Sequence, residues 1–228
     1  MKKFLMFVLL IVCAKNILAQ DENNGVRLGL TLSPQISWMN AGDKNIQANG
    51  SYVGFAYGLL MDVVFRKNYA FSSGILVSYD GGKLTYLSDT RFNSYGDSLL
   101  FVPVVNVDYR TQYLQIPLTI KLRTNQIGYI TYFGQFGLQG GVRIRSRADV
   151  SDPTMSFAEN KVDFSKDVTL PDFGLLIGAG VEYAITGNTA LLGAIQFYNG
   201  FIDATDNPQN YKTKSTLNHL RLQLGVFF

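Results

Sequence analysis

Few side chains in this sequence are of types and spacings suited to catalysis. Two carboxylates, Asp62 and Glu182, could act as a general acid and a general base if they met in a cleft. His219 is the only histidine, and metal sites generally need more than one His or Cys ligand. A nucleophilic triad around His219 would have to use Ser215 and Asp206, which are near it only along the chain. The sequence therefore predicts no catalytic residue, no metal site and no cofactor.

The elements that carry these residues show a repeat of two, which is typical of β-strands with one apolar face. In the stretch YLQIPLTIKL, residues 113–122, every second side chain is leucine or isoleucine, and the side chains between them are mostly polar. The repeat predicts eight strands, near residues 25–38, 51–65, 69–87, 109–123, 128–147, 170–186, 189–201 and 217–228.

The connections and the composition indicate how these strands are arranged. Short turns at 66–68, 124–127 and 186–188 alternate with long polar connections at 39–50, 88–108, 148–169 and 202–216. The strands are far longer than the roughly 5 to 6 residues of a typical globular strand. Only 16% of the residues are charged, against about 25% in soluble proteins. These features favour an all-β fold, an eight-stranded antiparallel up-and-down transmembrane β-barrel, over a soluble β-sandwich.

The N-terminal stretch MKKFLMFVLLIVCAKNILAQ has the layout of a secretory signal peptide. Its apolar run is too short to span a bilayer as a helix. We expect residues 1–19 to be a signal peptide, cleaved after Ala19 or after Gln20, and residues 20–228 to form the barrel. A lipoprotein signal at Cys13 is the alternative, but Val12 stands where such a signal needs a small residue.

Removal of the signal peptide changes the charge of the chain. It takes away three of the 20 lysines and arginines and none of the 17 acidic residues, so the mature chain is near neutral. A near-neutral chain without a basic stripe is not expected to bind nucleic acid. Export and the barrel pattern predict a location in the cell outer membrane, with lipid as a partner, both mature termini in the periplasm and the long connections outside the cell.

Five charged residues are expected on the inner face of the barrel. Strand direction places Arg27, Asp62, Lys121 and Glu182 in the periplasmic half of the lumen, and Arg221 nearer the middle. Buried charges must be paired, and an eight-stranded barrel is just wide enough for side chains to fill it. We therefore expect an ion-pair network that fills the lumen. The alternative is a narrow gated pore.

Three arginines, Arg143, Arg145 and Arg147, recur at every second position of the fifth predicted strand. Strict alternation would place all three on the inner wall, toward the extracellular mouth. One interpretation is an anion-binding vestibule. The favoured interpretation is that they pair with acidic residues of the adjoining connection, residues 148–169.

The sequence resembles a known family. The stretches QYLQIPLTIKLRT (112–124), FGLLIGAGVEY (173–183) and SSGILVSYDGGKL (72–84) are similar to the PorT-like outer-membrane β-barrel proteins of Bacteroidota. The final strand, LNHLRLQLGVFF, ends on Phe228, and this ending resembles the C-terminal signature that the barrel-assembly machinery reads. The resemblance implies that Phe228 is an assembly signal. As an alternative function, it implies an accessory role in type IX-like protein secretion, with which the namesake of the family is associated.

We expect the barrel to act structurally or to bind a protein partner through its long connections, chiefly 88–108 and 148–169, or through its periplasmic rim. The run LLFVPVVNV, residues 99–107, is too apolar for a solvated loop. It is expected to extend a strand, cap the mouth or bind a partner. A small-solute or ion channel and a secretion accessory are the alternative functions, and no enzymatic activity is expected.

Overall fold

The computed structural model describes residues 25–98, 101, 104–152, 156–187, 189–206 and 213–228. The signal peptide predicted for residues 1–19 lies outside the described residues. No helix within the described part of the chain is both long and apolar enough to cross a membrane.

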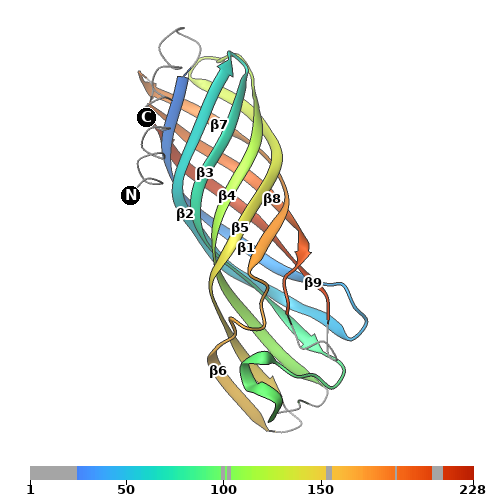
Figure 1. Ribbon diagram of the computed structural model, residues 1–228. Coiled ribbons are helices and arrows are strands. Elements are labelled where there is room, and N and C mark those ends of the chain that lie inside the picture. The colour runs from blue at the N-terminus through green and yellow to red at the C-terminus, as the bar shows by residue number, and fades with distance from the viewer. Residues whose placement is uncertain (1–24, 99–100, 102–103, 153–155, 188, 207–212) are drawn as a thin grey trace, which may run out of the picture.

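Eight long antiparallel strands form one closed barrel (Figure 1). The strands are β1 (Gly25–Ala41), β2 (Ile46–Arg66), β3 (Tyr69–Tyr86), β4 (Val105–Arg123), β5 (Ile130–Asp152), β7 (Pro171–Thr186), β8 (Thr189–Asp203) and β9 (Ser215–Phe227). Neighbours in the chain pair with each other, and β9 returns to pair with β1 and close the sheet. The predicted eight-stranded up-and-down barrel is confirmed.

Exposure alternates along each strand as the repeat of two requires. On β1, Leu30 and Leu32 are 53% and 61% exposed, whereas Thr31 and Ser33 between them are 7% and 1% exposed. On this strand, apolar side chains thus point outward and small or polar ones point into the interior. This distribution of apolar and polar side chains is the reverse of that in a soluble protein, and it suits a barrel whose outer surface contacts lipid.

The two ends of the barrel differ. Both termini of the described barrel and the three short turns lie at one end, here called the turn end (Figure 1). The long connections lie at the other, the loop end, where β4 and β5 run beyond the predicted strands. There β5 also pairs with a short strand, β6 (Phe157–Asp163), which the sequence pattern did not predict.

The loop end has a hydrophobic core of its own. Phe92 and Phe101, on either side of the 3₁₀-helix η1 (Asn93–Ser98), are fully buried in it. Val105 and Val107 on β4 point into the same core. The apolar run of the connection 88–108 therefore does two of the three things expected of it. It extends a strand and contributes to a cap over the mouth of the barrel.

Candidate functional site in the lumen and on the outer wall

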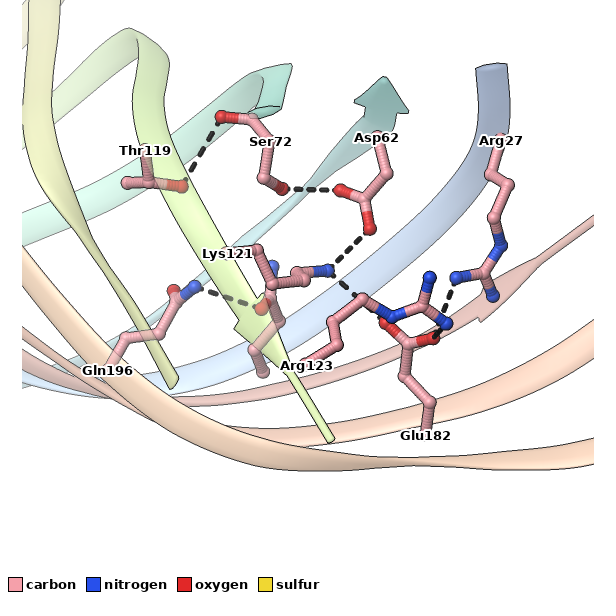
Figure 2. A network of polar contacts seen from close by, with 9 residues as sticks. Arg27, Asp62, Ser72, Thr119, Lys121, Arg123, Glu182 and Gln196 are labelled. Atoms are coloured by element: carbon pink, nitrogen blue, oxygen red, sulfur yellow. Dashed lines mark hydrogen bonds and ion pairs between the residues drawn. The ribbon is translucent and has the colours of Figure 1, made fainter. Parts of the chain in front are cut away.

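Four of the five predicted lumen charges meet near the turn end (Figure 2). Lys121 Nζ lies 2.6 Å from Asp62 Oδ2 and 3.3 Å from Glu182 Oε1. Arg27 Nη1 lies 2.7 Å from Glu182 Oε2. These side chains come from β4, β2, β7 and β1, so the contact exists only because the sheet closes into a barrel. We call this group the turn-end network.

Two further residues complete the turn-end network. Arg123 Nη2 lies 3.2 Å from Glu182 Oε2, so Glu182 binds three cations. The Ser72 hydroxyl donates a hydrogen bond to Asp62 Oδ1. Arg123 was not predicted, although it follows Lys121 by two residues and so shares its face. The two arginines are partly exposed at the mouth, whereas Lys121 and Asp62 are buried beneath them.

Aromatic rings support the buried ammonium group. Lys121 Nζ lies 4.6 Å from the ring centroid of Phe133 and 5.0 Å from that of Phe227. Arg27 Cζ lies 4.6 Å from the same Phe227 ring. Cations over aromatic faces gain electrostatic energy from the ring quadrupole, most of all where water is absent. The penultimate residue of the chain is thus part of the lumen packing.

Arg221 belongs to a second cluster, nearer the middle of the barrel. Its Nε donates to Gln35 Oε1 at 2.7 Å, and its Nη2 donates to Gln115 Oε1 at 2.9 Å. Gln35 Nε2 in turn donates to Asp80 Oδ1 at 2.7 Å. Among the described residues, Arg221 makes no ion pair with the turn-end network. The prediction of one network that includes Arg221 is therefore wrong, because Arg221 stands opposite Gln35, which is eight positions further along β1 than Arg27.

His219 lies in this second cluster. Its Nδ1 is 3.3 Å from Asp80 Oδ1, and its ring stacks on that of Tyr198 with centroids 4.8 Å apart. All three side chains are fully buried. Asp80 was not predicted from the sequence, although it lies on the inward face of β3. Within the described chain, no three His, Cys, Asp or Glu side chains are grouped as metal ligands would be.

The connections of the loop end are tied to one another by hydrogen bonds. The carboxylate of Asp167 accepts bonds from the backbone N–H groups of Asn93 and Ser94 and from the Ser94 hydroxyl. The Asn93 amide donates to the backbone carbonyl of Asp206. Burial raises the pKa of Asp167, against the effect of the bonds from Ser94 and Asn93. These hydrogen bonds, here called the Asp167 clasp, therefore join three of the four long connections above the hydrophobic core.

The three arginines of β5 do not share one face. Arg143 pairs with the buried Tyr113, points inward, and donates to the backbone carbonyl of Ser165. The register then shifts, because Tyr113 faces Arg143 whereas the preceding β4 residue faces Arg145. Ile144 is the extra residue of this β-bulge, and it is exposed on the outer wall.

Beyond the bulge the alternation of β5 is reversed. Arg145 and Arg147 pair with Gln112 and Arg110, whose side chains point outward. The prediction that all three arginines line the inner wall is therefore wrong for Arg145 and Arg147. A bulge inserts one residue and moves every later side chain to the opposite face.

The outward arginines border a groove on the outer wall. It has a volume of about 320 Å³. Its lining residues are Tyr52, Tyr79, Arg110, Thr111, Gln112, Arg145, Arg147 and Lys161. We call the four cations of this lining, Arg110, Arg145, Arg147 and Lys161, the outer basic patch.

The last residue lies on the outer wall at the turn end. Phe228 is exposed, and its backbone N–H donates to the Leu28 carbonyl at 2.8 Å. The chain end is therefore held in the sheet by β1, while the ring faces the surroundings of the barrel.

Comparison with known proteins agrees with this geometry. Residues 18–206 match the family model described as the outer membrane protein beta-barrel domain. The chain belongs to this family. As a family member, it is an outer-membrane β-barrel whose lumen is occupied by the two clusters described above. No curated protein matches the sequence.

Several solved outer-membrane barrels align with this family member over most of its length. Neisserial surface protein A is 12% identical, with 89% of this chain and 95% of that chain covered and a TM-score of 0.48. OprG from Pseudomonas aeruginosa is 10% identical, with 89% and 93% covered and a TM-score of 0.43.

Proposed function

We propose that this outer-membrane barrel is a closed scaffold, which holds a folded loop-end structure at the membrane surface for binding to a partner. The observation that supports this best is the filling of the lumen at three depths. The turn-end network, the Arg221 cluster and the hydrophobic core of the loop end follow one another along the barrel. Most of the side chains in these layers are buried, which opposes free passage of ions or solutes.

The proposed orientation places the turn end in the periplasm and the loop end outside the cell. Outer-membrane barrels combine short periplasmic turns with long extracellular connections, and this chain has the same asymmetry. Both mature termini are then periplasmic. Phe228, exposed at the end of β9, is proposed as the signal read by the barrel-assembly machinery. Deletion of Phe228 should lower the amount of barrel in the outer membrane but not its refolding in detergent.

The connections 88–108 and 148–169 are the proposed partner-binding surface. Their described aromatic residues lie in or against a common core, and the Asp167 carboxylate holds the first backbone N–H groups of η1. A surface that is already ordered loses little conformational entropy on binding. This favours recognition of a protein or glycan partner over an enzymatic role, because the Asp80–His219 pair is fully buried and out of reach of a substrate.

The PorT-like resemblance and a Bacteroidota origin are part of the proposal. They are supported by the three motifs and the terminal phenylalanine of the sequence. An accessory role in type IX-like secretion would use the same binding surface or the periplasmic rim. Such a role predicts co-purification with another component of a secretion machine.

Planar-bilayer recordings test the closed scaffold. The refolded, heat-modifiable barrel should give no steady conductance. Asp62→Ala and Glu182→Ala remove partners from the turn-end network, and they should give at most brief openings while the two other layers persist. A steady wild-type conductance that changes in these variants would refute the scaffold and identify a channel instead.

A further inference from the structure

We propose that the outer basic patch binds the phosphate-bearing headgroup of a lipid in the leaflet that surrounds the loop end. The patch lies on the outside of the barrel, apart from the lumen, and only Lys161 of its four cations belongs to the partner-binding connections. The proposal rests on the proposed function only for the choice of leaflet. With the loop end outside the cell, the ligand is an outer-leaflet lipid.

The height of the patch on the barrel supports a lipid ligand. Leu114 and Ile144 are exposed on the outer wall and mark the upper part of the apolar belt on β4 and β5. The next outward pair is Gln112 with Arg145, followed by Arg110 with Arg147. At a rise of about 3.3 Å per residue, Arg147 lies roughly 10 Å beyond Ile144 along the strand, which is about 8 Å in height for a strand tilted by about 40°. A lipid whose chains lie along Leu114 and Ile144 therefore has its headgroup at the arginines.

The charges of the patch are only partly compensated. Arg110 forms an ion pair with Asp149, and Asp149 also accepts the backbone N–H of Lys161 at 2.7 Å. Asp163 stands opposite Arg147 in the register of β5 and β6. Two carboxylates thus face four cations. Among the described residues, neither Arg145 nor Arg147 takes part in an ion pair.

The groove offers the donors that a phosphate group prefers. The guanidinium group presents a planar fork that binds phosphate oxygens in pairs, and three such forks border one hollow of about 320 Å³. Tyr79 and Tyr52 line the same hollow, and the Tyr79 hydroxyl accepts a bond from Gln112 Nε2 at 3.2 Å. Tyrosine is enriched at the level of lipid headgroups, where its ring is buried and its hydroxyl is wet.

The patch is confined to one side of the barrel. On β1 the outward residue above the apolar belt is Asn40, and on β8 the outward Asn199 stands among apolar neighbours near the loop end. The exposed Lys44 and Lys214, near the loop ends of β1 and β9, are single cations, whereas the patch gathers four cations beside one groove. The gathering of cations beside one groove, beyond the bulge at Ile144, indicates a site for one headgroup.

Native mass spectrometry of the refolded full chain in a maltoside detergent tests the proposal, because this detergent contains no phosphate. The probes are diphosphoryl lipid A and a glycolipid with the same chains but no phosphate. The wild type should retain the phosphorylated lipid preferentially. Arg145→Gln with Arg147→Gln should lower its affinity about tenfold or more, because charge-assisted bonds are lost.

A matched control removes two cations from the opposite rim. Arg66→Gln with Lys67→Gln alters the exposed last residue of β2 and the exposed first residue of the turn that follows it. It should leave the affinity within about twofold, since exposed charges at that distance are screened. Asp163→Asn removes a carboxylate from the patch and should strengthen binding. Arg145→Lys with Arg147→Lys keeps the charge without the fork and should bind with intermediate affinity. All variants are checked for the folded band by heat-modifiable gel mobility.

Three results would overturn the proposal. The first is unchanged affinity in the folded double glutamine variant. The second is an equal loss in the turn-end control. The third is equal retention of the two glycolipids. Displacement of the lipid by millimolar inorganic phosphate would identify a site for free phosphate instead. Conductance of the wild-type barrel would refute the closed scaffold but leave these results unchanged, so the two failures are distinguishable.

Discussion

The buried ion pair between Lys121 and Asp62 allows a sharp test of how the lumen is held together. At an effective dielectric constant of about 20, opposite charges 2.6 Å apart attract by about 6 kcal/mol. The loss of hydration of two buried ions offsets much of this gain. Lys121→Met removes the cation but leaves Asp62 dehydrated, with the Ser72 hydroxyl as its partner. We expect the variant to lower the free energy of unfolding by about 3–5 kcal/mol.

The double variant separates the cost of an unpaired charge from the value of the pair. Asp62→Asn together with Lys121→Met removes both charges at nearly constant volume. We expect it to recover at least half of the loss, because replacing a whole buried pair is often close to neutral. Lys83→Met is the matched control. Lys83 pairs with Asp108 on the outer wall, both partly exposed, and exposed pairs contribute about 0.2–1 kcal/mol.

Equilibrium urea unfolding of the refolded barrel in lipid vesicles provides the measurement. Trp38 is the only tryptophan, so its fluorescence reports on the barrel without further labels. Folded and unfolded forms are counted independently by heat-modifiable gel mobility. A loss below about 1 kcal/mol for Lys121→Met, equal to that of Lys83→Met, would refute the reasoning. Such a result would mean that water reaches Asp62 and that the lumen is not sealed at this depth.

Three further predictions concern other parts of the barrel. Phe92→Ala should destabilise the loop-end core by about 3–5 kcal/mol, because Phe92 is fully buried and packs against three aromatic rings. The rate of amide hydrogen exchange should rise at the loop end and stay unchanged at the turn end. Gly58→Val should prevent refolding on gels, because a Cβ at Gly58 would lie 2.0 Å from the Ile75 carbonyl oxygen. Hydrogen bonds from the hydroxyl and the backbone N–H of Ser165 lower the pKa of Asp163, so the stability that the ionised carboxylate contributes is present at neutral pH and is lost as pH falls through the lowered pKa. An NMR titration of the Asp163 carboxyl should have its midpoint below 3.8, and a midpoint at or above this value would contradict the structure.

Much of the barrel could be predicted from the sequence because the pattern behind it is local. A repeat of two assigns each side chain to a face without knowledge of the neighbouring strand. The short turns fix the direction of each strand, and direction fixes depth. This is why Arg27, Asp62, Lys121 and Glu182 could be placed together in advance, and why the structure brings them within ion-pair distance. Lipid outside the barrel enforces the pattern, since an outward charge in the belt would be costly.

The remaining features depend on which residues meet across strands, and only the tertiary structure decides that. The bulge at Ile144 arises from the pairing of β4 with β5, and no residue in the stretch VRIRSR marks it. Its effect is to turn Arg145 and Arg147 from the lumen to the outer wall. The assembly of Arg221, Asp80 and His219 likewise depends on the closing of β9 onto β1. The sequence by itself determined the faces of the strands, and the closure of the sheet decided which side chains share a site.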